Sequence, residues 1–168
     1  MAKWSFEVAT WTPTATADAA NLTNNSYMAL QGGSATQRID VSEIYMGGQA
    51  TSSSPTFMTF SRDSTVGATL TALTTGQKNA ALDPATAALA AAQQPFTAAT
   101  TAPQRSSTLA GLNLSFNAYG GIVRWTAMDP TETFRLLGNT ASLGEASLSA
   151  YTGGTPGLLG SHIVYEPL

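Results

Sequence analysis

Polar and apolar residues alternate along most of this chain, in short runs that end at glycine, proline or small polar residues. Alternation with a period of two is typical of β-strands that bury one face. Eight to ten such runs, with no helices alternating between them, predict an all-β fold, a jelly-roll-like β-sandwich of antiparallel strands. The expected strands are 3–11, 26–31, 37–46, 56–62, 68–73, 108–117, 122–128, 133–137, 146–151 and 161–166.

The run 37–46 changes phase in its middle. The two apolar pairs on either side of the change have opposite parity, Ile39 with Val41 and Ile44 with Met46. A β-bulge adds one residue to a strand and thereby inverts the parity of everything that follows it. We therefore expect a bulge near Ser42 and Glu43 that brings both pairs onto one face.

Two connections have the composition of tight turns. Residues 118–121 end in Gly120-Gly121 and predict a hairpin that joins the runs before and after them. Asp63-Ser64-Thr65 predicts a turn directly after the run 56–62.

Residues 75–103 interrupt the rhythm of short strands. They are rich in Ala, Gln and Thr and contain three prolines. Asp83-Pro84 fits the N-cap and first position of a helix, so 85–93 is a candidate for two helical turns. Long connections inside a compact domain are usually functional. We expect a single β-sandwich domain over 1–168, with 75–103 as an extended excursion at a contact surface.

Composition and charge exclude several function classes. Only 10% of the 168 residues are charged, the formal net charge is −3, and the seven basic residues are scattered, so nucleic-acid binding is not expected. No run approaches the ~18 to 20 apolar residues of a membrane span. The first eight residues alternate and lack the apolar stretch of a signal peptide. We expect a protein that is made and folded in a cytosol and has no membrane partner.

Residues that perform chemistry are sparse. The chain has one histidine, His162, and no cysteine, and its acidic residues show no metal-ligand spacing. Ser161 neighbours His162 on a predicted strand, where successive side chains point to opposite faces, so the two cannot form a nucleophile and base pair. The sequence therefore predicts no enzyme activity, no cofactor and no metal site.

The aromatic residues allow two interpretations. They can fill the core and line protein interfaces, which is the commoner role. They can also form a platform for carbohydrate, as in lectin-like jelly rolls. The residues concerned are Trp4, Trp11, Tyr119, Trp125, Tyr151 and Tyr165.

The overall pattern, and above all the segment 137–167 (LGNTASLGEASLSAYTGGTPGLLGSHIVYEP), resembles small virion proteins of tailed bacteriophages. Within that group the chain looks like a capsid decoration, or cement, protein. The resemblance covers most of the chain as a general pattern rather than a defined motif. Proteins of this kind sit on the outside of the head shell, join neighbouring capsomers and often have a jelly-roll or related β fold.

The resemblance implies a non-enzymatic virion structural protein, synthesised in the host cytoplasm and located on the capsid exterior. Its implied partners are the major capsid protein of the same virion and further copies of itself, as a dimer or trimer. Termini and long loops reach across a lattice more easily than core strands, so contacts are expected there. The candidate interface residues are Trp4, Phe96, Tyr151, His162, Tyr165 and Leu168. Two alternatives stay open, a tail or neck component of the phage and a head-fibre or glycan-binding β-sandwich domain.

Overall fold

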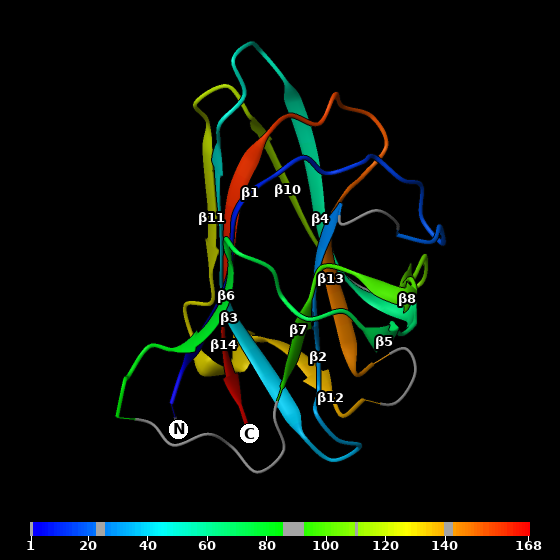
Figure 1. Ribbon diagram of the computed structural model, residues 1–168, viewed down its shortest axis with the longest axis vertical. Helices are drawn as coiled ribbons and strands as arrows, with labels where there is room; N and C mark the ends of the chain where they lie inside the picture. The colour runs from blue at the N-terminus through cyan, green and yellow to red at the C-terminus, as the bar shows by residue number, and fades with distance from the viewer. Residues whose placement is uncertain (1, 23–25, 86–92, 110, 140–142) are drawn as a thin grey trace.

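The computed structural model describes residues 2–22, 26–85, 93–109, 111–139 and 143–168 (Figure 1). These residues form two facing β-sheets, as the alternation predicted. Within the described ranges the only helical segment is the 3-10 turn η1, Pro130–Glu132. No helix of the described residues is long and apolar enough to cross a membrane.

The first sheet, sheet I, has the strand order β11-β3-β14-β1-β6, and β12 also pairs with β3. All of its pairs are antiparallel. Its strands are β1 (Trp4–Trp11), β3 (Arg38–Gly48), β6 (Gln77–Ala81), β11 (Ile122–Thr126), β12 (Phe134–Leu137) and β14 (Leu159–Pro167).

The second sheet, sheet II, has the order β10-β4-β13-β2-β7, and β9 also pairs with β4. Its strands are β2 (Tyr27–Gln31), β4 (Pro55–Thr65), β7 (Gln94–Phe96), β9 (Gln104–Arg105), β10 (Gly111–Asn117) and β13 (Glu145–Ala150). A separate two-stranded ribbon joins β5 (Ala68–Leu70) to β8 (Ala99–Thr101).

The path of the chain between the sheets is that of a jelly roll. Strands β1 to β4 alternate between sheet I and sheet II. Farther along, the chain crosses from β10 in sheet II to β11 and β12 in sheet I, then to β13 in sheet II and back to β14 in sheet I. The last strand, β14, lies between β1 and β3 in the middle of sheet I, while β13 lies between β2 and β4 in sheet II. The predicted all-β sandwich of jelly-roll type is therefore the fold of the described residues.

The core fills the space between the sheets. It is built from the alternating inward side chains of both, which include Phe6, Met28, Ile39, Val41, Ile44, Met46, Phe60, Leu148 and Ile163, all without exposed surface. The predicted bulge is confirmed, because β14 pairs Val164 with Glu43 and Tyr165 with Val41, which leaves Ser42 as the extra residue. The extra residue restores both apolar pairs of β3 to the core face.

Two predicted turns are wrong. The segments on either side of 118–121 do not pair as a hairpin, because β10 pairs with β4 in sheet II and β11 with β3 in sheet I. The connection crosses from one sheet to the other. Residues 63–65 do not turn either, since they continue β4, which pairs there with β9. Turn-forming residues show where a chain can bend, but pairing partners decide whether it does.

The excursion 75–103 is mostly built into the sandwich rather than held away from it. Its strands β6 and β7 extend sheets I and II beyond β1 and β2. Pro95 is compatible with β7 because β7 lies at a sheet edge, where a missing N–H group is tolerated. The predicted helical turns fall largely on 86–92, which lie outside the described residues.

Candidate functional site

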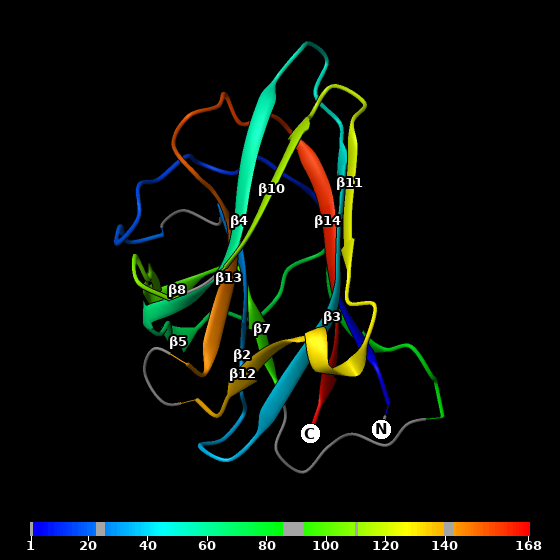
Figure 2. The same cartoon turned by 180° about the vertical axis from the view of Figure 1, so that it is seen from behind.

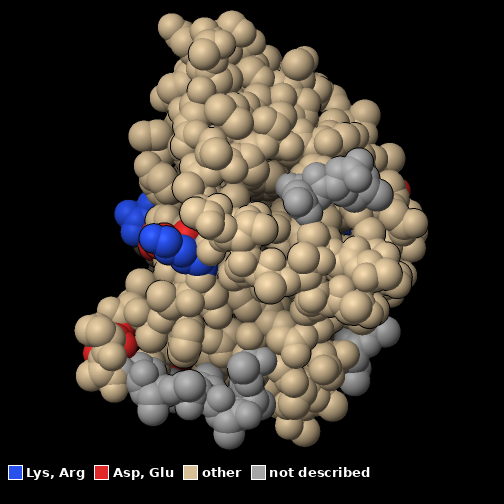
Figure 3. Space-filling model, viewed as in Figure 1, with Lys and Arg blue, Asp and Glu red and all other residues tan. Residues whose placement is uncertain are grey.

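The outward faces of the two sheets differ in what covers them. The chain itself packs on the outward face of sheet II, through the segment 12–22, β9 and the β5–β8 ribbon (Figures 1 and 2). The outward face of sheet I carries partly exposed side chains along β1, β3 and β14. Few charged side chains are visible on the face shown in Figure 3. Many of the buried polar side chains therefore belong to sheet II, where the covering segments exclude solvent from them.

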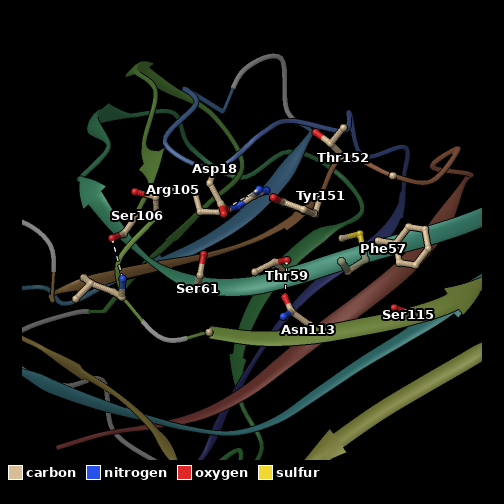
Figure 4. Close-up of a pocket in the computed structure, with 15 residues that line it drawn as sticks. Asp18, Phe57, Thr59, Ser61, Arg105, Ser106, Asn113, Ser115, Tyr151 and Thr152 are labelled. Carbon is tan, nitrogen blue, oxygen red and sulfur yellow. Dashed lines mark hydrogen bonds and ion pairs between the residues drawn. The ribbon is translucent and has the colours of Figure 1, made fainter.

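A pocket of about 430 Å³ lies on the outward face of sheet II (Figure 4). Its walls come from β4, β10, the segment before β2 and the residues that follow β9 and β13. Two aromatic rings, Phe57 and Tyr151, are both a little over one third exposed and lie among hydroxyl, amide and charged groups. The polar lining consists of Asp18, Thr59, Ser61, Arg105, Ser106, Ser107, Asn113, Ser115 and Thr152.

Arg105 is the buried cation of this pocket, with no exposed surface. It donates to the carbonyl oxygens of Thr16 at 3.1 Å and Ala150 at 3.0 Å, and to the hydroxyl of Ser149. The carboxylate of Asp18 lies 3.8 Å from it and is partly exposed. Its Nε has no partner among the described residues. Arg105 thus attaches the segment before β2 to β13 and keeps one donor unused.

Three side chains of β4 and β10 form the opposite wall. Thr59 donates to the amide oxygen of Asn113 at 3.0 Å, which fixes that amide across the strand pair. Ser61 is 3% exposed, and its hydroxyl has no partner within the described part of the chain. In Figure 4 the Ser61 hydroxyl points from the strand toward Asp18 and Arg105.

A pair of carboxyl groups is buried beside the pocket. Asp63 on β4 and Glu145 on β13 are hydrogen-bonded to each other and have no exposed surface. Burial raises the pKa of Glu145 to about 7, and burial together with the Glu145 charge raises that of Asp63 well above its usual range. Ser147 donates to Asp63 at 2.7 Å, and Gln31 donates to Glu145 at 2.8 Å. Like charges this close resist joint ionisation, which is why the Glu145 charge adds to burial in raising the pKa of Asp63.

The open face of sheet I carries a smaller cluster. The rings of Tyr45 and His162 stack with centroids 5.2 Å apart. Glu43 lies 3.3 Å from the Nε2 of His162 and accepts from Arg124 at 2.8 Å. The hydrogen bond from Arg124 is the main reason that the pKa of Glu43 lies below its usual value. The arrangement is a surface ion pair beside a ring stack, and the one hydrogen-bond partner of the imidazole among the described residues is the Glu43 carboxylate.

One side of the sandwich is rich in apolar surface. The edge strands β10 and β11 lie side by side on facing sheets there, and no described strand pairs with their outer edges (Figure 2). Half-buried apolar side chains line the seam between them, namely Leu112, Leu114, Phe116, Val123 and Trp125. Tyr119 and Ile122, 60% and 66% exposed, lie at the end of the seam where the chain passes from β10 to β11. Met128, 94% exposed, follows β11 at the other end. This set is called the β10–β11 side below.

The six interface residues predicted from the sequence do not form one surface. Phe96 and Tyr165 have no exposed surface, because Phe96 packs on Tyr27 and Tyr165 joins the main core, so neither is available to a partner. Trp4 is partly buried against that core. The other three have exposed surface in different places. Tyr151 lies at the pocket, His162 on the open face of sheet I, and Leu168 at the C-terminal end.

The sequence did not single out Asp18, Asp63, Arg105 or Glu145. They come from four different segments, and no local spacing connects them. The only signal present in the sequence is that polar residues alternate along strands whose outer face was expected to meet solvent. Packing of the chain onto that face turns ordinary polar positions into a buried network.

Within the described ranges no group of three or more His, Cys, Asp or Glu side chains is placed to hold a metal ion. Comparisons of the chain with protein-family models, with curated proteins and with solved structures gave no match. Function is therefore inferred from the geometry above.

Proposed function

We propose that this chain is a non-enzymatic structural protein of a bacteriophage virion, which binds the outside of the capsid and cements neighbouring capsomers. The observation that carries the proposal is the β10–β11 side, where apolar side chains and two unpaired strand edges coincide. Exposed apolar patches of this kind mark protein–protein contacts. Unpaired strand edges present backbone donors and acceptors to which another chain can add.

The jelly roll is a common architecture of viral capsid proteins, which adds support. Its two termini lie at the same end of the sandwich in Figure 1, whereas the loops next to Tyr119 lie at the opposite end. A protein with an apolar side between these ends can bridge two neighbouring subunits. Contacts repeated by the symmetry of a shell add up, so each contact can be weak.

The charge pattern favours contacts that tolerate salt. A net charge of −3 and a charged fraction of 10% leave little long-range electrostatic attraction or repulsion. Binding through the β10–β11 side is then dominated by apolar burial and backbone hydrogen bonds. Such binding changes little with ionic strength, which suits a protein that stays on a particle outside the cell.

The decisive experiment mixes the purified protein with capsids assembled without it, followed by sedimentation and electron microscopy. We expect saturable binding at regular positions on the shell and greater resistance of the shell to heat. Ile122→Asp places a charge on the β10–β11 side and should weaken binding by about tenfold or more. Leu82→Asp is the matched control, because Leu82 is 56% exposed but follows β6 at the opposite edge of sheet I.

Absence of binding to the shell would overturn the proposal, as would equal binding by both variants. Rings or tubes formed by the protein alone would instead favour a tail or neck component. A dimer or trimer in solution that is disrupted by Ile122→Asp, without shell binding, would mean that the β10–β11 side joins copies of this chain.

A further inference from the structure

The pocket on the outward face of sheet II shares β10 with the β10–β11 side but is lined by the other face of that strand. Its β10 residues Gly111, Asn113 and Ser115 alternate with Leu112, Leu114 and Phe116 of the β10–β11 side. We infer that this pocket binds a neutral saccharide. The inference stands on the shape, lining and charge of the pocket and does not depend on binding to a capsid.

The pocket has the size and the aromatic walls that a sugar needs. Its volume of about 430 Å³ falls within the ~300–1,000 Å³ of small-molecule sites. Phe57 and Tyr151 both line it, and the apolar C–H face of a sugar packs on aromatic rings of this kind. The two residues are neighbours, since the Tyr151 N–H donates to the Phe57 carbonyl at 2.7 Å.

Both rings are held in place before any ligand arrives. The Phe57 ring packs on Gly154 so closely that a Cβ at that position would lie 2.7 Å from it. The Tyr151 ring lies 5.5 Å from the guanidinium of Arg105, within the range of a cation–π contact. Rigid rings lose little conformational entropy on binding, which favours a preformed site.

Two buried polar groups of the lining have unused hydrogen-bonding capacity. The hydroxyl of Ser61 and the Nε of Arg105 belong to side chains that are 3% and 0% exposed, and neither atom has a partner among the described residues. Buried polar groups are nearly always hydrogen-bonded, and leaving one without a partner is unfavourable. A polyhydroxylated ligand supplies both an acceptor and a donor to such groups. Asn113 and Asp18 add an amide and a carboxylate, which are common partners of sugar hydroxyls.

The charge of the pocket favours a neutral ligand over an anion. Arg105 is its only basic lining residue and already faces the carboxylate of Asp18 at 3.8 Å. Asp63 and Glu145 lie in the same buried network, and Asp63 interacts with the charge of Arg105. A phosphate or carboxylate would therefore meet as much negative as positive charge. Neutral hydroxyl groups meet no such penalty.

The test is calorimetric titration of the full chain with maltose, cellobiose, lactose and chitobiose, together with a printed array of bacterial glycans and a parallel titration with inorganic phosphate. We expect at least one saccharide to bind saturably and phosphate not to bind. Tyr151→Ala and Phe57→Ala should each weaken that binding by about tenfold or more. Tyr119→Ala removes a more exposed ring, 60% against 38% for Tyr151, that lies outside the pocket, and should leave the affinity unchanged.

Ser61→Ala separates binding from folding. Because the Ser61 hydroxyl has no partner in the described chain, its removal should leave the thermal unfolding temperature unchanged or raise it. The same variant should lower saccharide affinity severalfold. No binding to any saccharide tested, saccharide binding that Phe57→Ala and Tyr151→Ala leave intact, or binding of phosphate in preference to sugars would each overturn the inference. Shell binding by a protein that fails this test would leave the proposed function standing.

Discussion

The carboxyl groups of Asp63 and Glu145 are hydrogen-bonded to each other beneath the outward face of sheet II, although they lie on different strands and far apart in the sequence. Neither carboxyl group has exposed surface. The neighbouring Ser147 and Gln31 donate to them, and the backbone N–H of Gly67 donates to Glu145 at 3.0 Å. The pair ties β4, β13, β2 and the residues before β5 together, so its protonation affects how firmly the covering segments are held.

This pair makes stability depend on pH. Both carboxyls have a higher pKa in the folded protein than in the unfolded chain, so the folded state holds more protons between about pH 4.5 and 7. The free energy of unfolding therefore falls as pH rises through this range, by on the order of 3 kcal/mol from Glu145 alone. Thermal unfolding from pH 5 to 8 measures this slope. The lowered pKa of Glu43 acts in the opposite sense, but only at more acidic pH.

Asp63→Asn should flatten the slope, because an amide can donate to Glu145 without adding a second charge. Glu132→Gln, at an exposed carboxyl in η1, is the control and should keep the wild-type slope. A slope that is the same in Asp63→Asn and in the wild type would show that the pair does not control the pH dependence.

Two adjacent glycines of β3 should respond very differently to substitution. A Cβ on Gly48 would lie 2.1 Å from the carbonyl oxygen of Ala118, a backbone atom that cannot move aside easily. Its N–H also donates to Gly121 at 2.8 Å, which fixes the crossing between β10 and β11. Gly48→Ala should cost about 2 kcal/mol or more, or prevent folding. At Gly47 the nearest atom is 3.9 Å away in the Tyr45 ring, so Gly47→Ala should change little in urea unfolding.

The hydroxyl of Tyr165 attaches the excursion 75–103 to the last strand. It donates to the Asn79 amide oxygen at 2.6 Å, and the ring has no exposed surface. Tyr165→Phe should lower the free energy of unfolding by about 1 kcal/mol, the usual value of one such hydrogen bond. Tyr119→Phe alters an exposed tyrosine and should have no effect in the same denaturant titration. Equal stability of the two variants would mean that β6 is held without this contact.

Arg105 should matter far more for stability than an exposed arginine does. Arg105→Met abolishes the hydrogen bonds to Thr16 and Ala150 and leaves their carbonyl oxygens without this donor. We expect a loss of about 3 kcal/mol and earlier proteolysis of the segment 12–22. Arg124→Met breaks the ion pair with Glu43, but the Arg124 side chain is 59% exposed and solvent screens the pair, so the loss of stability should be small.

Much of the fold could be predicted because strand alternation is a local property. The bulge at Ser42 is the clearest case, since the change of parity in β3 alone located it. The alternation on β10 likewise matches a strand with one inward face. The site was harder to predict. Tyr151 was named as a candidate interface residue and as one of six aromatic residues that could fill the core or form a carbohydrate platform. The pocket that it lines is assembled from segments that no spacing connects.

The sequence by itself determined that this protein consists of short strands with one apolar face each, because the alternation of polar and apolar residues is a local property of each strand. Only the tertiary structure decided which strands pair, since β10 and β11 are neighbours in sequence yet belong to different sheets. It also decided that Ser147 and Ser149, the polar residues of an alternating strand, are completely buried. The physical reason is that covering segments pack on the outer face of sheet II, and the position of a covering segment depends on the whole chain rather than on any local pattern.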